Sequence, residues 1–577
     1  MEEGSVATSD DDVDENLPPR RGRGRGSSSG CGRGLKRPAA AAKAPKVQKT
    51  VAKGANKRPK VIDARSQMPD DNDDQCQMSE GDASTSESEE TKRIAKAEAI
   101  WKPRPAKDDE CEVSSEECEG NADLKSSTLL SFLTWTMEKV LKPEEIDALK
   151  QAPDLALGEL CAGMATATIA LQALELKLQE VHQIPLKCQA TFYTESVEWK
   201  RDVCRIVHKH AGGGSAGAEA ALLRRTADLV GSPQSCNLMV GAIECDDISN
   251  LSSTPRSVLD ATGRSGSSFL EMKDAIKSMK PKPAFIVIEC VASLNRMRSS
   301  VQEKGTEVVS EKLSELAYVG QWRTVNSSSF GIPQSRSRTY GIFTLLTEGY
   351  GPEGKAFHDK QIGKIWNLVE RCQLRQPQLL QSLLQQAGFV ADASKKKPKS
   401  QPAMKRPASK KKDPKWIRQH GAFKKKFKIS DAELQHEAIK KLKKHPDGLD
   451  VTEREIDASC LKLAVQVRKG KLDTSNMVCN VGDSVGYLRW SSSLHPCVLP
   501  TKKYLYVVNG EMFTNVNCSG GQIYPLLQGL GQKEMEMCGL HQKLSASQIQ
   551  DLSGNAFTSN IIAAIMLAIC CKWNVSR

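Results

Sequence analysis

A cysteine and a glutamate in the middle of the chain have the residue types and surroundings that covalent chemistry requires. Cys245 lies in the stretch GAIECDDISNL, directly after an apolar run typical of a buried strand, and Glu289 ends a second such run, AFIVIE. A thiol can attack an electrophilic carbon while a neighbouring carboxyl group donates a proton to the same substrate. A core thiol that behaves as a small apolar side chain is the alternative interpretation of Cys245.

Two arginines form a second candidate group. The stretch from 330 to 343 reads FGIPQSRSRTYGIF, in which Pro333 marks a turn before Arg336 and Arg338. The two arginines alternate into a strand, so we expect both guanidinium groups to project from the same face. Two fixed planar cations suit a phosphate and a carbonyl oxygen. An exposed edge strand is the alternative.

Alternating strand and helix patterns surround these residues. From about 155 onward, apolar runs such as LALGELCAG and CNLMVGAIE alternate with helical patterns such as ATATIALQALEL and FLEMKDAIKSM. This alternation predicts an α/β fold, a parallel sheet with helices on both faces, whose ligand site lies at the carboxyl ends of the strands. Four residues are expected at those strand ends: Gly163, Glu195, Cys245 and Glu289.

The first two of these residues suit a nucleotide-like cofactor. A glycine in the first turn, at Gly163, permits close approach of the backbone to a ligand. A carboxylate after the second strand is the usual partner of ribose hydroxyls, and either Glu195 or Glu198 could fill that position. We favour Glu195 because it directly follows the strand-like run ATFYT.

Taken in order, these segments resemble the motifs of the cytosine-5 DNA methyltransferase family. The resemblance covers about 150 to 345 and again roughly 520 to 575, and it places the family's variable target recognition domain between those blocks. It implies a Rossmann-like methyltransferase core that depends on S-adenosylmethionine, with an inserted target recognition region. The matching segments are LCAGMATATIAL for Phe-x-Gly-x-Gly, FYTES for the acidic motif, GAIEC for Pro-Cys, FIVIECVASL for Glu-Asn-Val, FGIPQSRSRTYGIF for Gln-x-Arg-x-Arg and SGNAFTSNIIAAI for Gly-Asn.

The resemblance implies a role for each candidate residue. Cys245 would attack carbon 6 of a flipped-out cytosine, and Glu289 would protonate the ring at N3. Carbon 5 would then take the methyl group of S-adenosylmethionine. Arg338 would hold the base carbonyl and Arg336 a phosphate. The residues expected to line the cofactor are Cys161, Ala162, Gly163, Glu195, Asp228 and Asn555.

The chain departs from the family pattern around the nucleophile. Pro-Cys-Gln reads Glu244-Cys245-Asp246, Glu-Asn-Val reads Glu289-Cys290-Val291, and Ala165 stands where a glycine is expected. Carboxylates beside a thiol raise its pKa unless they point away or pair with arginine. Three functions therefore stay open: a DNA cytosine-5 methyltransferase, a methyltransferase-like nucleic-acid-binding protein with little or no turnover, and an RNA cytosine-5 methyltransferase.

Composition indicates the partners. The net charge is +12 and the Lys and Arg residues come in runs, which favours a polyanion, DNA or RNA. The 18 cysteines include no CxxC pair and no regular spacing with histidine, so we expect no metal. No stretch reaches the ~18 apolar residues of a membrane span, so we expect no membrane partner. Two basic clusters, at 35–49 and 56–60, resemble nuclear import signals and favour the nucleus, with a solvated basic tail as the alternative.

Composition shifts along the chain also predict its organisation. Seven regions are expected: a disordered charged N-terminal region at 1–125, a helical lead-in at 126–150, the catalytic core at 151–345, a helical connector at 346–394, a basic linker at 395–446, a small mixed or β-rich target-recognition-like module at 447–530, and a segment at 531–577 that returns to the core.

Overall fold

The structure, a computed structural model, describes residues 128–573 with internal gaps. The predicted disordered region at 1–125 and both import-like clusters lie outside the described residues. The gaps are 212–219, 250–251, 253, 299–302, 347–351, 375–379, 388–413, 445–450, 471, 473, 483, 487, 501, 509–510, 515–522 and 542.

Seven strands form the central sheet: β1 (Leu155–Leu160), β2 (Cys188–Thr194), β3 (Ala221–Leu223), β4 (Leu238–Ala242), β5 (Phe285–Val291), β8 (Tyr318–Asn326) and β10 (Ser337–Leu345). Their order is β3-β2-β1-β4-β5-β10-β8. The pairs from β3 to β5 are parallel, and β10 pairs in antiparallel fashion with both β5 and β8. The chain order reverses between β1 and β4, which is the position where doubly wound sheets bind ligands. The predicted α/β class is confirmed.

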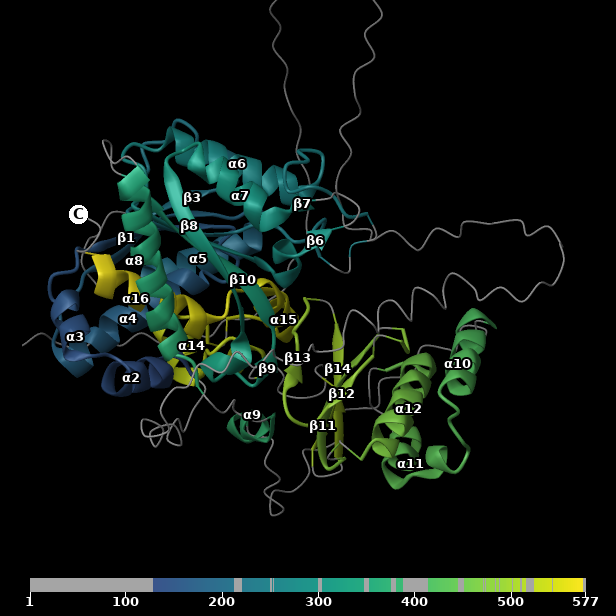
Figure 1. Cartoon of the computed structure of the whole chain (residues 1–577). Coiled ribbons are helices and arrows are strands. Elements are labelled where there is room, and N and C mark those ends of the chain that lie inside the picture. The colour runs from purple at the N-terminus through teal and green to yellow at the C-terminus, as the bar shows by residue number, and fades with distance from the viewer. Residues whose placement is uncertain are drawn as a thin grey trace, which may run out of the picture. The chain divides into compact units, whose positions relative to one another are not determined.

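Helices cover both faces of this sheet (Figure 1). The central strands are buried almost throughout, which is the burial expected of parallel strands covered on both sides. One face is covered by α2 (Leu129–Lys139), α3 (Pro143–Leu149), α4 (Thr166–His182), α5 (Glu198–Ala211), α8 (Pro352–Arg371) and α16 (Ser559–Lys572), and the other by α6 (Arg264–Ser278) and α7 (Gly305–Ser314).

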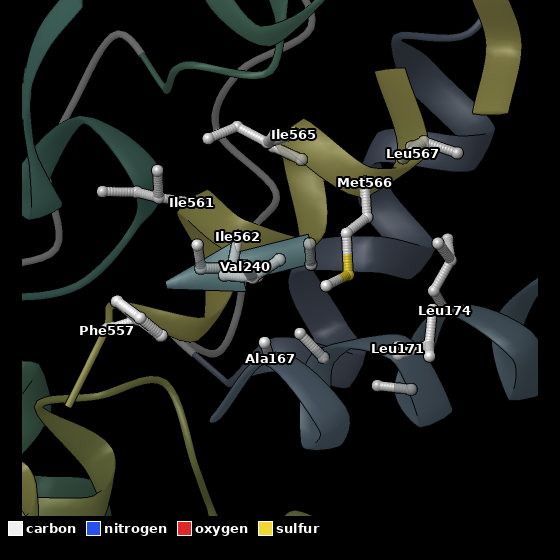
Figure 2. Close-up of a cluster of buried hydrophobic side chains, with 14 of the residues drawn as sticks. Ala167, Leu171, Leu174, Val240, Phe557, Ile561, Ile562, Ile565, Met566 and Leu567 are labelled. Carbon is white, nitrogen blue, oxygen red and sulfur yellow. The ribbon is translucent and has the colours of Figure 1, made fainter. Parts of the chain in front are cut away.

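Helix α16 is the centre of the larger core. Its residues from Ser559 to Cys571 are all buried, which is the environment that a helix apolar on every side requires. Figure 2 shows Ile562 and Met566 of α16 in one cluster with Val240 of β4 and Leu171 of α4. The end of the chain therefore packs on the same sheet as residues 155–345.

A second hydrophobic cluster joins the basic segment to the module that follows it. Four helical and four strand elements contribute, namely α10 (Pro414–Lys426), η5 (Glu433–Gln435), α11 (Glu437–Lys444), α12 (Glu453–Arg468), β11 (Asn476–Val481), β12 (Trp490–Ser491), β14 (Lys503–Val508) and β15 (Glu511–Thr514). The strands form one sheet in the order β12-β11-β14-β15. The module is therefore mixed α/β rather than β-rich.

The structure adds detail to the predicted organisation in two segments. The described part of the basic linker, 414–444, is largely helical, because Phe423, Ile439 and Leu442 are buried in the module's cluster. The predicted connector also splits, because α8 packs on the central sheet while α9 (Leu380–Gln386) joins a cluster with β14. In both cases apolar residues at helical spacing lie between the charged ones.

Short elements complete the fold around the strand ends. Their bounds are η2 (Thr226–Leu229), η3 (Ala292–Asn295), β6 (Met297–Arg298), β7 (Glu303–Lys304), η4 (Ser327–Phe330), β9 (Gln334–Ser335), β13 (His495–Pro496), α13 (Ile523–Leu526), α14 (Gln532–Met537) and α15 (Ala546–Asn555). Strand β13 pairs in parallel with β9, which places residues 495–496 beside the start of the Gln-x-Arg-x-Arg stretch.

Candidate active site at the strand ends

Hydrogen bonds join the turn after β1 to the end of β2. The backbone N–H of Cys161 donates to the Thr194 hydroxyl at 3.1 Å, that of Ala162 to the Thr194 carbonyl at 3.0 Å, and that of Gly163 to the Glu195 carboxylate at 3.0 Å. Gly163 has a φ of +52°, a conformation that side chains other than glycine adopt at a cost. The structure thus brings together four of the residues predicted to line the cofactor.

The carboxylate that joins this turn is Glu195 and not Glu198. Glu195 is 8% exposed, and its second oxygen accepts from the N–H of Val197 at 2.9 Å, whereas Glu198 is exposed at the first position of α5. The turn also lies in a negative field. Burial raises the pKa of the Cys161 thiol to about 12, and the charges of Glu244, Glu195 and Glu271 add to this rise.

The other two predicted cofactor residues have local partners. Asp228 is exposed in η2, and its carboxylate accepts from the N–H of Arg225 at 2.9 Å. Asn555 is exposed at the end of α15 and donates to Asp551 at 3.1 Å. Asp551 in turn pairs with Lys200 at 2.8 Å, so Asn555 is linked to α5, the helix that begins just after Glu195.

Cys245 is exposed in the loop that follows β4. Its carbonyl accepts from the N–H of Ile248 at 3.2 Å and of Ser249 at 2.8 Å, so the loop folds as one helical turn. Asp246 pairs with Arg264 at 2.9 Å, on the helix that follows. One of the two carboxylates that flank the thiol is therefore partly neutralised.

The charges around the Cys245 thiol oppose one another. Partial burial raises its pKa, Arg338 and Arg336 lower it, and Glu289 and Asp246 raise it, with burial the largest contribution. Both arginines and the acid candidate therefore act on the charge of the nucleophile candidate. The net direction is upward, so the thiol form is favoured in the free protein.

Glu289 lies inside β5 and not after it. It is 7% exposed and pairs with Arg338, with 3.0 Å between Oε1 and Nε. Burial raises the pKa of the Glu289 carboxyl group, and the two arginines offset part of that rise. A raised pKa favours the protonated carboxyl group, which is the form that can donate a proton.

Arg336 acts on the same thiol and carboxyl group through its charge, but its guanidinium group also has backbone partners of its own. It is 3% exposed, and its guanidinium group donates to the carbonyls of Val498 at 3.4 Å, Gly554 at 3.1 Å and Ala556 at 2.8 Å. Arg336 lies between β9 and β10, where its backbone N–H donates to the Gln334 carbonyl and forms a tight turn. The alternation of side chains expected in a strand therefore does not apply to Arg336. Arg336 joins the closing motif to the module.

Cys290, which replaces the family's asparagine, holds the nucleophile loop. Its thiol donates to the Ile243 carbonyl at 3.6 Å, and the Ile243 N–H donates to the Glu289 carbonyl at 3.1 Å. These two contacts fix residue 243 against β5, two positions before Cys245. A thiol is a weaker donor than an amide, so this is a weak hydrogen bond.

Two residues of the site were not anticipated from the sequence. Glu159 in β1 is fully buried and accepts from the N–H groups of Ala167 and Thr168 at the start of α4. A glutamate within an apolar strand was an available signal. Cys497 reaches Arg336, with 3.8 Å between Sγ and Nη1, and nothing in its local sequence indicated this position.

Within the described ranges, no group of three or more His, Cys, Asp or Glu side chains could hold a metal ion. No described helix is by itself long and apolar enough to cross a membrane; α15 and α16 meet that criterion only as a pair, across a 45° bend.

Comparison with solved structures returns methyltransferases at low identity. The S. pombe methyltransferase Dnmt2 is 12% identical, with a TM-score of 0.34 over 72% of this chain and 97% of that chain. A protein of E. coli described as a putative DNA modification methyltransferase encoded within a prophage is 12% identical, with a TM-score of 0.37 over 73% of this chain and 99% of that chain.

Among curated proteins, the DNA (cytosine-5-)-methyltransferase DMT5 of Cryptococcus neoformans is 22% identical over 473 residues. The match covers 74% of this chain and 17% of the relative, so the chain spans about a sixth of that protein's length. The family described as C-5 cytosine-specific DNA methylase matches residues 156–464, which is more than half of the chain and includes the turn after β1, Cys245, Glu289 and both arginines. The chain belongs to the C-5 cytosine-specific DNA methylase family.

Proposed function

We propose that this protein transfers a methyl group from S-adenosylmethionine to carbon 5 of a cytosine in DNA. The observation that carries the proposal is the ion pair between Glu289 and Arg338, together with the backbone hydrogen bond from Ile243 to Glu289 that holds the loop of Cys245 against β5. That arrangement supplies a nucleophile, an acid and a cation to one small ring. A cytosine needs all three, because a neutral ring is a poor electrophile until N3 is protonated.

The residues at the turn after β1 fit the cofactor. S-adenosylmethionine carries a positively charged sulfur, and the field of Glu195, Glu244 and Glu271 around this turn is negative. The backbone of residues 161–163 would hold the cofactor, and Glu195 would accept from its ribose hydroxyls. When bound, the cofactor supplies an electrophilic methyl group.

Each site residue then has a defined task. The target base must leave the duplex, because its carbon 6 cannot be reached inside a base-paired stack. The Cys245 thiolate adds to carbon 6, Glu289 gives its proton to N3, and Arg338 holds both the Glu289 carboxylate and the base carbonyl. Arg336 acts through structure, because it holds the closing motif in place.

A second candidate function is nucleic-acid binding with little or no turnover. It is favoured by the raised pKa of the Cys245 thiol and by the carboxylate of Asp246 beside it. The pairing of Asp246 with Arg264 and the charges of Arg336 and Arg338 oppose it, because each favours the thiolate. We therefore rank active transfer first.

DNA as the partner and the nucleus as the location belong to the same proposal. The family description and the name of the curated relative both refer to DNA, and the net charge of +12 suits a polyanion. The two import-like clusters of the N-terminal sequence support the nucleus. Direct imaging of the full-length protein, with and without substitutions in both clusters, tests the location.

The decisive experiment compares wild-type protein with Cys245→Ser in the presence of radiolabelled S-adenosylmethionine and, separately, duplex DNA and total RNA. We expect label on carbon 5 of DNA cytosines with wild type and none with Cys245→Ser. Cys188→Ser is the matched control, because Cys188 begins β2 at the opposite end from the site, and it should label DNA normally. Label on RNA alone would support the RNA alternative. Cofactor binding without label on either substrate would support the binding function.

A further inference from the structure

Helices α10 and α11 turn their lysines away from the protein interior. The apolar residues Phe423, Ile439 and Leu442 of these helices are buried against α12 and the sheet behind it. Both helices lie beside α12 in Figure 1. Because the apolar side of each helix packs inward, its charged side faces solvent.

Six lysines, five on these helices and Lys428 just after α10, are exposed and form no ion pair with a described residue; they are called here the lysine face: Lys425, Lys426, Lys428, Lys440, Lys443 and Lys444. Between 414 and 444 the chain has ten Lys or Arg residues and three Asp or Glu residues. All three carboxylates are already engaged. Asp431 pairs with Lys424, Glu433 with Arg468, and Glu437 with Lys441. The segment has no acidic group left to neutralise the lysine face.

Lysines of both helices act on the same carboxylate, Asp431. Asp431 pairs with Lys424 near the end of α10, at 2.7 Å, and its pKa is lowered by that pair and further by Lys443 of α11. The positive charges therefore repel one another across the two helices. Lysines in the last turn of a helix are partly stabilised by its dipole, but this accounts for one or two charges and not for Lys440 in the middle of α11. Such a surface is stabilised by a polyanion.

The chemistry of the face selects duplex backbone over single strands. Proteins that bind single strands stack bases on exposed aromatic rings. In the described part of 414–444, Trp416, Phe423 and Phe427 are buried or half-buried, and Lys426 lies over the ring of Phe427 at 5.7 Å. Lysine ammonium groups act as point charges on phosphates and read no sequence.

We propose that the lysine face binds the phosphate backbone of duplex DNA outside the target base, and so supplies sequence-independent affinity. This inference rests on the proposed function, because it assumes that DNA is the substrate. The lysine face includes none of the residues that act on Cys245. Each phosphate contact contributes about 0.9 to the slope of log affinity against log salt.

The test measures the affinity of the full-length protein for a fluorescent DNA duplex between 50 and 200 mM salt. The triple variant Lys440→Gln, Lys443→Gln and Lys444→Gln should reduce the slope by about 2 to 3, which makes the loss of affinity over that range roughly 40-fold smaller. The matched control is Lys355→Gln, Lys360→Gln and Lys364→Gln on α8, which removes the same charge from three exposed lysines. Thermal unfolding of both variants within a few degrees of wild type shows that folding is intact.

The outcomes separate this inference from the proposed function. If the slope of log affinity against log salt is unchanged in the α11 variant, or changes equally in the α8 control, the proposed DNA binding by the lysine face is wrong. This holds whether or not methyl transfer occurs. The expected slope change without methyl transfer supports the lysine face and argues against the proposed activity. Lysine-dependent binding to an RNA hairpin but not to the DNA duplex overturns the choice of DNA.

Discussion

Arg338 on β10 and Glu289 on β5 form an ion pair across two neighbouring antiparallel strands, with 3.0 Å between Nε and Oε1. Glu289 lies directly opposite Tyr340, so Arg338 is its diagonal neighbour on the same face of the sheet. The register of one strand pair thus sets the distance between the acid and the cation. Two rigid strands hold this pair more accurately than loops would.

The first prediction concerns proton donation by Glu289. Glu289→Gln keeps the shape of the side chain but removes the acidic proton, so we expect methyl transfer to fall by about 100- to 10,000-fold. Affinity for duplex DNA should change only a few-fold. Single-turnover transfer of radiolabel, with binding measured on the same preparations, checks this. Near wild-type transfer by Glu289→Gln would exclude Glu289 as the acid.

The second prediction concerns the structural role of Arg336. Arg336→Lys keeps the positive charge but cannot donate to the carbonyls of Val498, Gly554 and Ala556 together. We expect the free energy of unfolding to drop by about 2 to 4 kcal/mol. Chemical denaturation of the two proteins measures this. A variant that unfolds like wild type but binds DNA more weakly would restore the phosphate role.

The third prediction concerns the backbone of the turn after β1. A methyl group added at Gly163 meets no atom closer than 3.9 Å, so the positive φ of +52° alone decides the effect of Gly163→Ala. We expect a loss of about 1 to 2 kcal/mol in unfolding free energy. The control is Gly363→Ala within α8, which also has open space, and it should stabilise the protein by up to about 1 kcal/mol. Equal effects of the two substitutions would contradict this explanation.

The fourth prediction concerns pH and Glu159. Burial raises the pKa of this carboxyl group from its ordinary 4.5 to about 7, although the hydroxyl of Thr168 and the N–H groups of Ala167 and Thr168 oppose the rise. Because the folded protein binds this proton more tightly than the unfolded chain does, the protonated carboxyl group favours folding. That contribution to stability is fully present below pH 4.5 and is lost as the pH rises through 7. Glu159→Gln removes the ionisation.

The stability of wild type relative to Glu159→Gln should therefore fall by about 2 to 3 kcal/mol between pH 5 and 7 and stay level above pH 8. Urea unfolding of both proteins at each pH gives this difference. A difference that is independent of pH would mean that Glu159 keeps one protonation state throughout, held there by its contacts with the start of α4.

Much of the catalytic core was predictable from local sequence. The strands at 155–160, 188–194, 238–242 and 285–291 and the helices between them were indicated by apolar runs and helical periodicity, and they are confirmed. The short strand β3 and the antiparallel direction of β10 were not predicted, because neither the pairing partner nor the direction of a strand is encoded in its own pattern.

The sequence by itself determined the alternation of strand and helix, the order of the motifs and the placement of Cys245, Glu195 and Gly163 after strands. These features follow from side-chain periodicity along a few consecutive residues. Only the tertiary structure decided the partners of long polar side chains. Arg336 and Arg338 are two residues apart, yet one binds carbonyls near 498 and 554 and the other pairs with Glu289. Those partners lie 162, 218 and 49 positions away in the chain, so no local pattern could identify them.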